Sequence, residues 1–576
     1  MQTVIATRER VDDSHLPAHL HPVIKQIYAA RGVSDPVELD NRASTLLNFN
    51  LFKDMDKACA LLVEALQQQS KVLIVGDFDA DGATSTSVLM EGLALFGFQH
   101  VDYLVPDRFS LGYGLSPALA EQIVTIAPDL VITVDNGISC ISGVEIVKNA
   151  GIKVLITDHH LQGEQLPNAD AIVNPNQHSC NFPSKSIAGV GVAFYLLVAL
   201  RHSLRELQYF ATQQQPEPNL AELLDIVALG TVADVVALDA NNRTLVYQGL
   251  ARIRSGKTRP GITALIEVAK RNAARLSASD FGFALAPRLN AAGRLDDMSL
   301  GIACLLSKDI NQARRIAGEL DALNHERREI EAGMQQEAQA VLERLVSTQQ
   351  SVPDVVCLYQ DDWHQGVIGI LAGRLKERYH RPAIIFAQGD EGEIKGSCRS
   401  IEGLHMRDLL EQINTQHPDL IAKFGGHAMA AGLTILERDF ERFKMAFTDA
   451  ASAILTEEHK QSVLLTDGEL PATCFNLDFA QLLQQAGPWG QQFPEPVFEG
   501  VFELIQQRIV GEKHLKLVLK HCSGQLVDAI AFNIDVKAWP NTAAQYAKLA
   551  YQLDINEFRG KFSLQLLVRE IQAQPA

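Results

Sequence analysis

The sequence predicts an α/β protein of several domains: one domain built on a parallel sheet, a long connecting helix, a smaller α/β domain and a C-terminal β-barrel. Three observations support this prediction. Short apolar runs alternate with amphipathic segments from about residue 71 to residue 175, as they do in βαβ units. Residues 309–346 keep apolar side chains at helical spacing among Arg and Glu. Five strand-like runs follow one another between residues 502 and 572.

The strands of the first domain are indicated by short apolar runs. The unbroken, β-branched run at residues 72–75 predicts a strand that is buried on both faces. Similar runs follow at residues 101–106, 130–134, 153–157 and 171–175. Because amphipathic segments separate them, we expect one parallel sheet. Residues 186–300 are then mainly helical in pattern.

The rest of the chain divides into three further parts. The segment 309–346 predicts one extended helix between domains, and the alternation of strands and helices resumes after residue 353. The five late runs fit a small closed barrel of the OB type, although an open sheet fits nearly as well. We therefore expect units at residues 1–305, 306–350, 351–458 and 459–576.

Length and composition are those of an ordinary globular protein. A chain of 576 residues is too long for one core, and 47% hydrophobic with 21% charged residues is a typical composition. No apolar run reaches the roughly 20 residues that span a bilayer, and the polar N-terminus is not a secretory signal. The eight cysteines include no C-x-x-C pair, which argues against a disulfide framework or a zinc ribbon. We expect a cytoplasmic protein without membrane contact.

Acidic and imidazole side chains follow three of the predicted strands at the point where each strand ends. In chain order these side chains are Asp77, Asp79, Asp81, Asp135, Asp158, His159 and His160. The carboxyl ends of parallel strands meet at one edge of the sheet, where ligands gather. A single Asp after a strand is usually a turn residue or a helix cap. Three such groups at one edge indicate a cation site, because crowded carboxylates raise each other's pKa.

The D-x-D-x-D-G pattern at residues 77–82 also has a rival interpretation, the start of a calcium-binding EF-hand loop. That loop needs a bidentate Glu at its twelfth position, which is Val88 here. It is also entered from a helix, whereas this segment leaves a strand. The pattern therefore does not fit a calcium loop.

A further acid, Asp234, lies between apolar segments in ALGTVADVVAL, where a charge is costly without a partner. A helix cap is the alternative interpretation. Carboxylates with one or two imidazoles suit Mn²⁺ or Mg²⁺ better than a metal that prefers thiolates. More carboxylates are present than one ion needs, and two ions about 4 Å apart are the arrangement that hydrolyses phosphate esters. The residues predict two-metal phosphoester hydrolysis.

Several motifs resemble those of one enzyme family. DFDADG, VDNG, TDHH and GTVADVV resemble, in this order, the four motifs of the DHH phosphoesterases, and GGHAMAAG resembles the signature of the accompanying DHHA1 domain. The motifs APRLNAAGR, GYGLS, WHQGVIGILAGRL and GSCRS narrow the resemblance. Over nearly its whole length the chain is similar to the family's bacterial single-strand-specific 5′-to-3′ exonucleases. The resemblance implies release of 5′ mononucleotides, in DNA recombination and repair.

The resemblance also implies roles for the acidic cluster. The Mn²⁺ ligands of the family match Asp79, Asp81, Asp135, His159 and Asp234. Asp135 would bridge two ions and act in catalysis, with His160 close to the scissile phosphate and Asp158 beside it. The position four residues before Asp79, which is His in many relatives, is Val75 here. We therefore include Asp77 among the metal ligands, since it could compensate.

By the same resemblance, the second domain closes over a narrow groove and holds the strand near its 5′ end. The candidate DNA-phosphate ligands are Arg108, Tyr113, Arg288, His364, Ser397, Arg399, Gly425, Gly426 and His427. Backbone N–H groups of adjacent glycines approach a phosphate closely, and Arg offers a bidentate fork. A groove too narrow for a duplex explains single-strand preference without base readout, and the barrel would extend it.

The net charge of −18 is unusual for a nucleic-acid-binding protein, so local patches matter more than the total. Eight Lys and Arg residues against one acid lie between Arg243 and Arg275. This stretch is either a solvated basic face or part of the groove. We expect Arg252 and Arg254 to contribute to DNA binding if it is part of the groove.

Two other functions remain open from the sequence. One is a DHH phosphoesterase of short oligonucleotides or cyclic dinucleotides, whose chains are typically shorter and lack the barrel. The other is a binding protein that has lost the chemistry, against which the intact acids and histidines argue. The resemblance further implies cooperation with a single-stranded-DNA-binding protein and a RecQ-type helicase. A monomer is expected, since no heptad seam is present.

Overall fold

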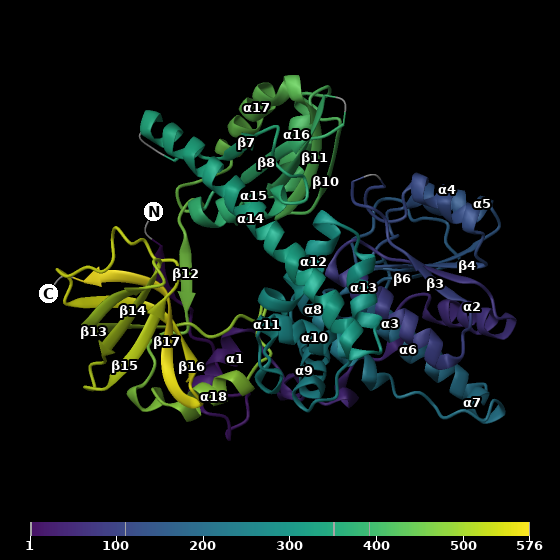
Figure 1. Cartoon of the computed structure of the whole chain (residues 1–576), viewed down its shortest axis with the longest axis horizontal. Coiled ribbons are helices and arrows are strands. Elements are labelled where there is room, and N and C mark those ends of the chain that lie inside the picture. The colour runs from purple at the N-terminus through teal and green to yellow at the C-terminus, as the bar shows by residue number, and fades with distance from the viewer. Residues whose placement is uncertain (1–2, 110, 350–351, 391, 575–576) are drawn as a thin grey trace.

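The computed structural model describes residues 3–109, 111–349, 352–390 and 392–574. Figure 1 shows three bodies: a parallel sheet with its helices, a smaller α/β domain and a β-barrel, the first two of which are joined by a long helix. In the described part of the chain, no helix has both the length and the hydropathy to cross a membrane.

The first sheet has the strand order β3-β2-β4-β5-β6, and all of its strands are parallel, as the sequence predicts. The strands are β2 (Val72–Val75), β3 (Val101–Leu104), β4 (Leu130–Val134), β5 (Lys153–Thr157) and β6 (Ala171–Val173). Alternate side chains enter two different cores, with Val72 and Ile74 on one face and Leu73 and Val75 on the other. The strand is therefore buried on both faces, and Val75 is part of the core.

Helices cover both faces of this sheet. On one face lie α2 (Met55–Gln68), α3 (Ala80–Phe96) and α6 (Gly189–Glu206), and on the other lie α4 (Pro117–Ile126) and α5 (Ile141–Asn149). Beyond α6 the chain is helical, as expected, through α7 (Tyr209–Thr212), α8 (Leu224–Ala233), α9 (Ala240–Arg254), α10 (Pro260–Val268), α11 (Ala278–Asp280), α12 (Ala286–Leu295) and α13 (Ser299–Leu306). Helix α8 is almost entirely buried, so its C-terminal end is held firmly beside the sheet.

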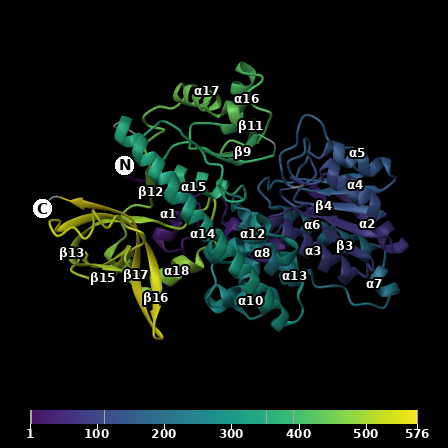
Figure 2. The ribbon, with the colours of Figure 1, turned by 45° about the horizontal axis from the view of Figure 1, so that its top comes forward.

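One helix of 40 residues, α14 (Ile310–Gln349), connects the first domain to the second, which confirms the predicted connector. Figure 2 shows it passing from α13 toward α15 (Ile368–Tyr379). The indole of Trp363 donates a hydrogen bond to Glu337 of α14, with 2.7 Å between nitrogen and oxygen. Arg374 of α15 pairs with Glu331 of α14 at 2.9 Å. These contacts fix the second domain on the connector.

The second domain is built on a mixed sheet with the strand order β10-β11-β9-β8-β7. Its strands are β7 (Val356–Tyr359), β8 (Ala383–Gln388), β9 (Glu393–Arg399), β10 (Lys423–Gly426) and β11 (Ala430–Leu436). Besides α15, its helices are α16 (Met406–Gln416) and α17 (Phe440–Ser452). One of the hydrophobic cores of this domain forms between the sheet, α16 and α17.

The C-terminal strands form a closed barrel in the order β13-β14-β15-β17-β16, which excludes the open sheet. They are β13 (Phe498–Val510), β14 (His514–Lys520), β15 (Leu526–Ala531), β16 (Tyr546–Phe558) and β17 (Lys561–Gln574), and α18 (Leu477–Gln485) packs on β16. Closure satisfies the edge strands that an open sheet would expose. The five strands were expected from the sequence, and their closure follows from the pairing of β13 with β16 and the parallel pairing of β15 with β17.

The beginning of the chain lies against its end. Strand β1 (Val4–Thr7) pairs in parallel with β12 (Val463–Thr466), and helix α1 (Pro22–Ala30) follows. Just after α1, Arg31 forms a buried ion pair with Asp467 at 2.7 Å. These contacts attach the barrel to the first domain, and two strands of four residues give no sequence signal of their pairing.

A close backbone contact joins α12 to the loop that follows β2. A Cβ atom at Gly293 would lie 1.7 Å from the carbonyl oxygen of Phe78, so only glycine fits there. We expect Gly293→Ala to lower the midpoint of thermal unfolding, with a cost of about 1–3 kcal/mol, because neither backbone can move freely. Gly318→Ala on α14 is the matched control, since nothing lies within 4 Å of its Cβ position. Equal midpoints for the two variants would contradict this interpretation.

Candidate metal centre

Four segments bring acids and imidazoles to the carboxyl edge of the first sheet. Asp79 is the N-cap of α3 and accepts a hydrogen bond from the Gly82 N–H at 3.0 Å, which places Asp81 in the first turn of the helix. Asp135 follows β4 in a left-handed conformation, with φ of 60°. Asp234 is the C-cap residue of α8. Helix capping, which the sequence analysis weighed as the alternative to metal binding, is therefore compatible with the convergence of Asp79 and Asp234 on one site.

His159 lies at the centre of the cluster. Its Nε2 atom is 3.1 Å from Asp135 Oδ1, 3.4 Å from Asp234 Oδ2 and 3.9 Å from Asp81 Oδ2. Three overlapping sets of ligand atoms lie within 4.8 Å of one another: Asp77, Asp79 and Asp135; Asp81, His159 and Asp234; and Asp135, His159 and His160. Asp135 and His159 each belong to two sets, which is the arrangement expected of neighbouring ion sites.

The cluster contains buried polar atoms without hydrogen bonds. They are Asp77 Oδ1, Asp135 Oδ1, His159 Nε2 and Asp234 Oδ2. Buried polar atoms are nearly always paired in proteins, so four unpaired atoms at one point indicate a site for cations. Carboxylate oxygens with one imidazole nitrogen suit Mn²⁺ or Mg²⁺. The donor set therefore fits these ions.

Burial and like charge perturb the pKa values of the cluster. Burial, followed by repulsion from Asp79, raises the pKa of Asp81 to about 7. The pKa values of Asp77, Asp135 and Asp234 are also raised well above their usual range, first by burial and then by neighbouring carboxylates. Burial lowers the pKa of His159 to about 4, so its ring is neutral and can serve as a ligand.

His160 differs from His159 because Asp158 holds it. Burial alone would lower the pKa of His160, but its hydrogen bond to Asp158 at 2.7 Å and the nearby carboxylates raise the pKa to about 9. Asp158 is itself fixed by the backbone N–H groups of Ile138, His159 and His160. Asp158 lies outside the three sets of ligand atoms. The pair thus places a protonated imidazole within the third set of ligand atoms, where it acts as a cation rather than as a metal ligand.

Residues that the sequence analysis missed form hydrogen bonds that hold the acidic segments in place. The backbone N–H groups of Gly189 and Val190, at the start of α6, donate to Asp81 at 2.7 and 2.9 Å. Asn290 of α12 accepts a hydrogen bond from the Ala80 N–H at 2.8 Å. Asn290 lies in the motif APRLNAAGR, which was its only signal. For Gly189 the sequence offers no signal, because a backbone donor has no characteristic side chain.

Several cationic side chains lie near the metal centre. Arg108 donates to the carbonyl oxygen of Gly293 at 2.9 Å and stacks on Phe78 at 4.0 Å. Arg294, which the sequence analysis did not select, donates to the carbonyl oxygen of Gly366 in the second domain at 2.9 Å. Burial, together with the charges of Arg108 and Arg399, lowers the pKa of Arg294 to about 9. Three guanidinium groups thus share one region, which favours an anion there.

The predicted phosphate ligands of the second domain mostly reach the same region. Arg399 lies on β9 beside Ser397, with its Nη1 atom 3.2 Å from the hydroxyl oxygen. Within the described residues, it makes no hydrogen bond to a carboxylate. The ring of His364 meets Phe109 of the first domain edge-on at 6.0 Å. Burial and then the charge of His160 lower the pKa of His427, which places His427 near the metal centre.

The remaining candidates are placed differently from one another. The hydroxyl group of Tyr113 donates to the carbonyl oxygen of Asp135 at 3.0 Å, so Tyr113 lies directly on the metal centre. Gly425 and Gly426 form the end of β10, and Gly426 has a φ of 143°. Arg288 is buried and pairs with Asp321 of α14 at 2.8 Å. Arg288 therefore joins α12 to the connector rather than extending into the cationic region.

The basic stretch between residues 243 and 275 is not one continuous basic face. Arg243 is buried and pairs with Glu38, and Arg259 is buried between Asp225 and Glu91. The guanidinium of Arg254 donates to the carbonyl oxygen of Leu276. The interpretation of this stretch as a single surface is wrong, because several of its charges stabilise packing between helices.

Comparisons with known proteins agree with this architecture. The family models that match are the N-terminal domain of the DHH family over residues 71–231, the DHHA1 domain over 352–454 and the RecJ OB domain over 466–570. A fold and site of this kind define the class of DHH-family proteins.

Similar proteins identify the family within this class to which the chain belongs. The chain is 52% identical to the single-stranded-DNA-specific exonuclease RecJ of Salmonella typhimurium, over 99% of both chains, and 54% identical to that of Haemophilus influenzae, over 96% of both. A crystal structure of Thermus thermophilus RecJ with Mn²⁺ matches with a TM-score of 0.79 and 28% identity, covering 99% of this chain and 80% of that one. A second Thermus structure contains Mg²⁺. The chain belongs to the RecJ family.

The raised pKa values predict how stability depends on metal and pH. Without ions, the folded cluster binds more protons than the unfolded chain between about pH 4 and pH 7, so the free energy of unfolding falls as pH rises through this window. His159 has the opposite effect, because its lowered pKa makes the folded state bind fewer protons, but it is one group and the carboxylates are several. Bound ions keep the carboxylates ionised and remove the loss. We expect the rise in unfolding midpoint with Mg²⁺ to be larger at about pH 7.5 than at about pH 5.5, measured by calorimetry.

The control is a double variant, Asp135→Asn with Asp234→Asn, which removes two of the converging carboxylates. Its midpoint should respond weakly to Mg²⁺ at both pH values. A wild-type response that is equal at both pH values, or larger at the lower one, would contradict the assignment of raised pKa values to the cluster.

The Asp158–His160 pair predicts a second titration. Asp158→Asn removes the carboxylate that opposes burial, so the pKa of His160 should fall from about 9 by about one unit or more. Carbon-13 NMR of labelled histidine rings measures this change, and the remaining histidines serve as internal references. An unchanged His160 pKa would mean that Asp158 does not control its protonation.

Proposed function

We propose that this protein is a metal-dependent exonuclease that degrades single-stranded DNA from the 5′ end and releases 5′ mononucleotides, in DNA recombination and repair. The observation that supports it best is the convergence of unpaired, buried carboxylates and one neutral imidazole beside a group of arginines. One of these arginines, Arg399, makes no hydrogen bond to a carboxylate within the described residues. Such a site is suited to a substrate that carries phosphate between metal ions and cationic side chains. The relatives named as single-stranded-DNA-specific exonucleases support the choice of substrate.

The metal ligands in this proposal are Asp77, Asp79, Asp81, Asp135, His159 and Asp234. A pair of Mn²⁺ or Mg²⁺ ions, when bound, supplies the Lewis acidity and the activated water of phosphodiester hydrolysis. The protein itself holds Asp81 in place through two backbone N–H groups and holds His159 in its neutral form. The ligand geometry is therefore set before the substrate arrives.

His160 and Asp158 contribute a fixed proton in this proposal. The His160 ring is protonated at neutral pH and lies against the hydroxyl oxygen of Tyr113 at 3.3 Å. A cation in this position stabilises the negative charge that develops on the phosphate during hydrolysis. Asp158 orients the ring and keeps it charged.

The 5′ polarity requires recognition of the strand end. Arg399 and Ser397 of the second domain, with Arg108 and His427, are proposed to bind a terminal 5′ phosphate, with the N–H groups of Gly425 and Gly426 nearby. The Arg399 guanidinium is largely buried, and burial lowers its pKa. A buried cation without a nearby acid gains stability when a phosphate binds. Tyr113 and His364 complete the proposed contact region.

The wider assignments follow the same proposal. The first unit, residues 1–305, carries the metal centre. The unit 351–458 binds the end of the DNA strand, and the connector 306–350 joins these two units. The barrel unit, 459–576, holds the strand beyond the site, as OB folds hold single strands. We propose a cytoplasmic monomer that acts with a single-stranded-DNA-binding protein and a RecQ-type helicase.

The proposal predicts the products of a digestion. A single strand labelled at one end should release 5′ mononucleotides progressively from the 5′ end with Mn²⁺ or Mg²⁺, and a chelator should abolish the reaction. Asp135→Ala should lower the rate by at least about a thousandfold, because it removes a ligand that belongs to two sets. Gel analysis of timed samples measures both results.

The matched control is Asp419→Ala, which removes an exposed acid of the second domain. It should leave the rate unchanged. Cleavage limited to strands of a few nucleotides would instead place the chain with phosphoesterases of small substrates. Strand binding without cleavage under any metal would make it a binding protein.

Recognition of the 5′ phosphate predicts a specific loss in Arg399→Ala. Wild type should prefer a strand with a 5′ phosphate over one with a 5′ hydroxyl, and the variant should lose about tenfold or more of that preference, since one charged contact is worth about 1.5–3 kcal/mol. Competition assays with the two strands measure the ratio. Arg438→Ala, an exposed arginine of the same domain, should retain the preference. A loss that is equal on both strands would assign Arg399 to general backbone contact.

A further inference from the structure

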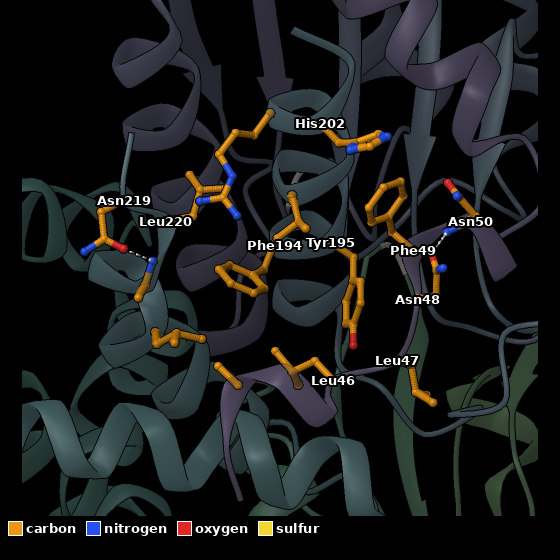
Figure 3. Close-up of a pocket in the computed structure, with 15 residues that line it drawn as sticks. Leu46, Leu47, Asn48, Phe49, Asn50, Phe194, Tyr195, His202, Asn219 and Leu220 are labelled. Atoms are coloured by element: carbon orange, nitrogen blue, oxygen red, sulfur yellow. Dashed lines mark hydrogen bonds between the residues drawn. The ribbon is translucent and has the colours of Figure 1, made fainter. Parts of the chain in front are cut away.

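A cavity of about 550 Å³ lies in the first domain, apart from the metal centre. It is lined by Ala43 and residues 46–50, by one side of α6, and by residues 219–221 with Leu224, and it is partly open to solvent. Figure 3 shows its lining side chains. Its lining shares no residue with the three sets of ligand atoms. Sites for small ligands have volumes of roughly 300–1,000 Å³, so the cavity is large enough for one.

The interior of the cavity is apolar and aromatic. Figure 3 shows Phe194 and Tyr195 on α6, with Leu220 on one side and Phe49 on the other. The phenol of Tyr195 donates to Asn241 Oδ1 at 2.7 Å, and Asn241 is not part of the lining. The polar end of Tyr195 is thereby satisfied. The residue is only 2% exposed, so it forms part of the apolar floor of the cavity.

The rim of the cavity presents hydrogen-bond donors. Asn48 Oδ1 accepts from the Asn50 N–H at 2.9 Å, and Asn219 Oδ1 accepts from the Ala221 N–H at 3.3 Å. Both side-chain carbonyl oxygens are used in capping short helical turns, so each amide has its NH₂ group left to offer. Two of the asparagines of the rim therefore act as donors.

A guanidinium adds positive charge to this rim. Arg201 donates from Nη1 to the carbonyl oxygen of Pro218 at 3.2 Å, and its Nε lies 3.4 Å from Glu217. Within the described ranges, its Nη2 donates no hydrogen bond. Glu217 also pairs with Arg205 and lies outside the lining. None of the lining residues is Asp or Glu, so the only acid paired with the Arg201 guanidinium among the described residues, Glu217, lies outside the cavity.

We propose that this cavity binds a small carboxylate with an aromatic or branched apolar body. The body packs against Phe49 and the apolar floor formed by Phe194 and Tyr195, and the carboxylate accepts hydrogen bonds from Arg201 Nη2 and a rim amide. Charge-assisted hydrogen bonds favour the anion over a neutral analogue of the same shape. The site is independent of the metal centre and of the nuclease function.

The test uses 4-phenylbutyrate and its uncharged amide, titrated into the full-length protein by calorimetry. We expect the acid to bind in one copy with a Kd of about 0.1–1 mM, which is reasonable for a ligand of this size, and the amide to bind at least about tenfold more weakly. Arg201→Met should weaken the acid to the level of the amide. Arg315→Met, which removes an exposed arginine of α14, should leave both titrations unchanged.

The comparison of the acid with its amide uses the wild-type protein, so this part of the test does not depend on the folding of a variant. Equal affinity for acid and amide, or binding of neither, would overturn the proposal. An equal loss in Arg315→Met would also overturn it, because the effect would then reflect net charge. Circular dichroism melting of each variant confirms that it is folded before titration.

Discussion

Repulsion among carboxylates at one edge of a sheet is the constraint on which the rest of this structure depends. Asp77, Asp81 and Asp135 are nearly inaccessible to water, and each has a raised pKa. A folded chain tolerates such a group only when protons or cations balance the charge. The cluster is thus suited to bind cations. Repulsion among its carboxylates lowers the free energy of unfolding when no ion is bound, and bound ions relieve this repulsion.

The scaffold meets this constraint with backbone and rigid helices rather than with mobile side chains. Two N–H groups at the start of α6 hold Asp81, and Gly293 allows α12 to approach the loop that carries Asp77 and Asp79. The buried helix α8 delivers Asp234. Backbone donors do not change rotamer, so the ligands keep their positions when the ions leave.

Guanidinium groups from both domains supply the opposite charge. Arg399 of the second domain approaches Arg294 and Arg108 of the first, and this crowding of cations is unfavourable until an anion binds. The connector α14 makes this possible, because its contacts with Trp363 and Arg374 fix the second domain at a defined distance. Acids on one side and guanidinium groups on the other suit a phosphodiester between them. The protein's acidic total charge is therefore no obstacle to binding DNA.

The sequence by itself determined the elements and the chemistry of the site. Strand runs such as residues 72–75 and the acids that follow them are local signals, because strand burial and carboxylate crowding are both written in neighbouring residues. Only the tertiary structure decided what depends on distant partners. It closed the barrel by pairing β15 with β17, joined β1 to β12, and placed Arg288 against Asp321 rather than toward the cationic region. It also placed the N–H groups of Gly189 and Val190 within hydrogen-bonding distance of Asp81. The partner of a backbone donor depends on the fold, because every residue except proline carries the same N–H group.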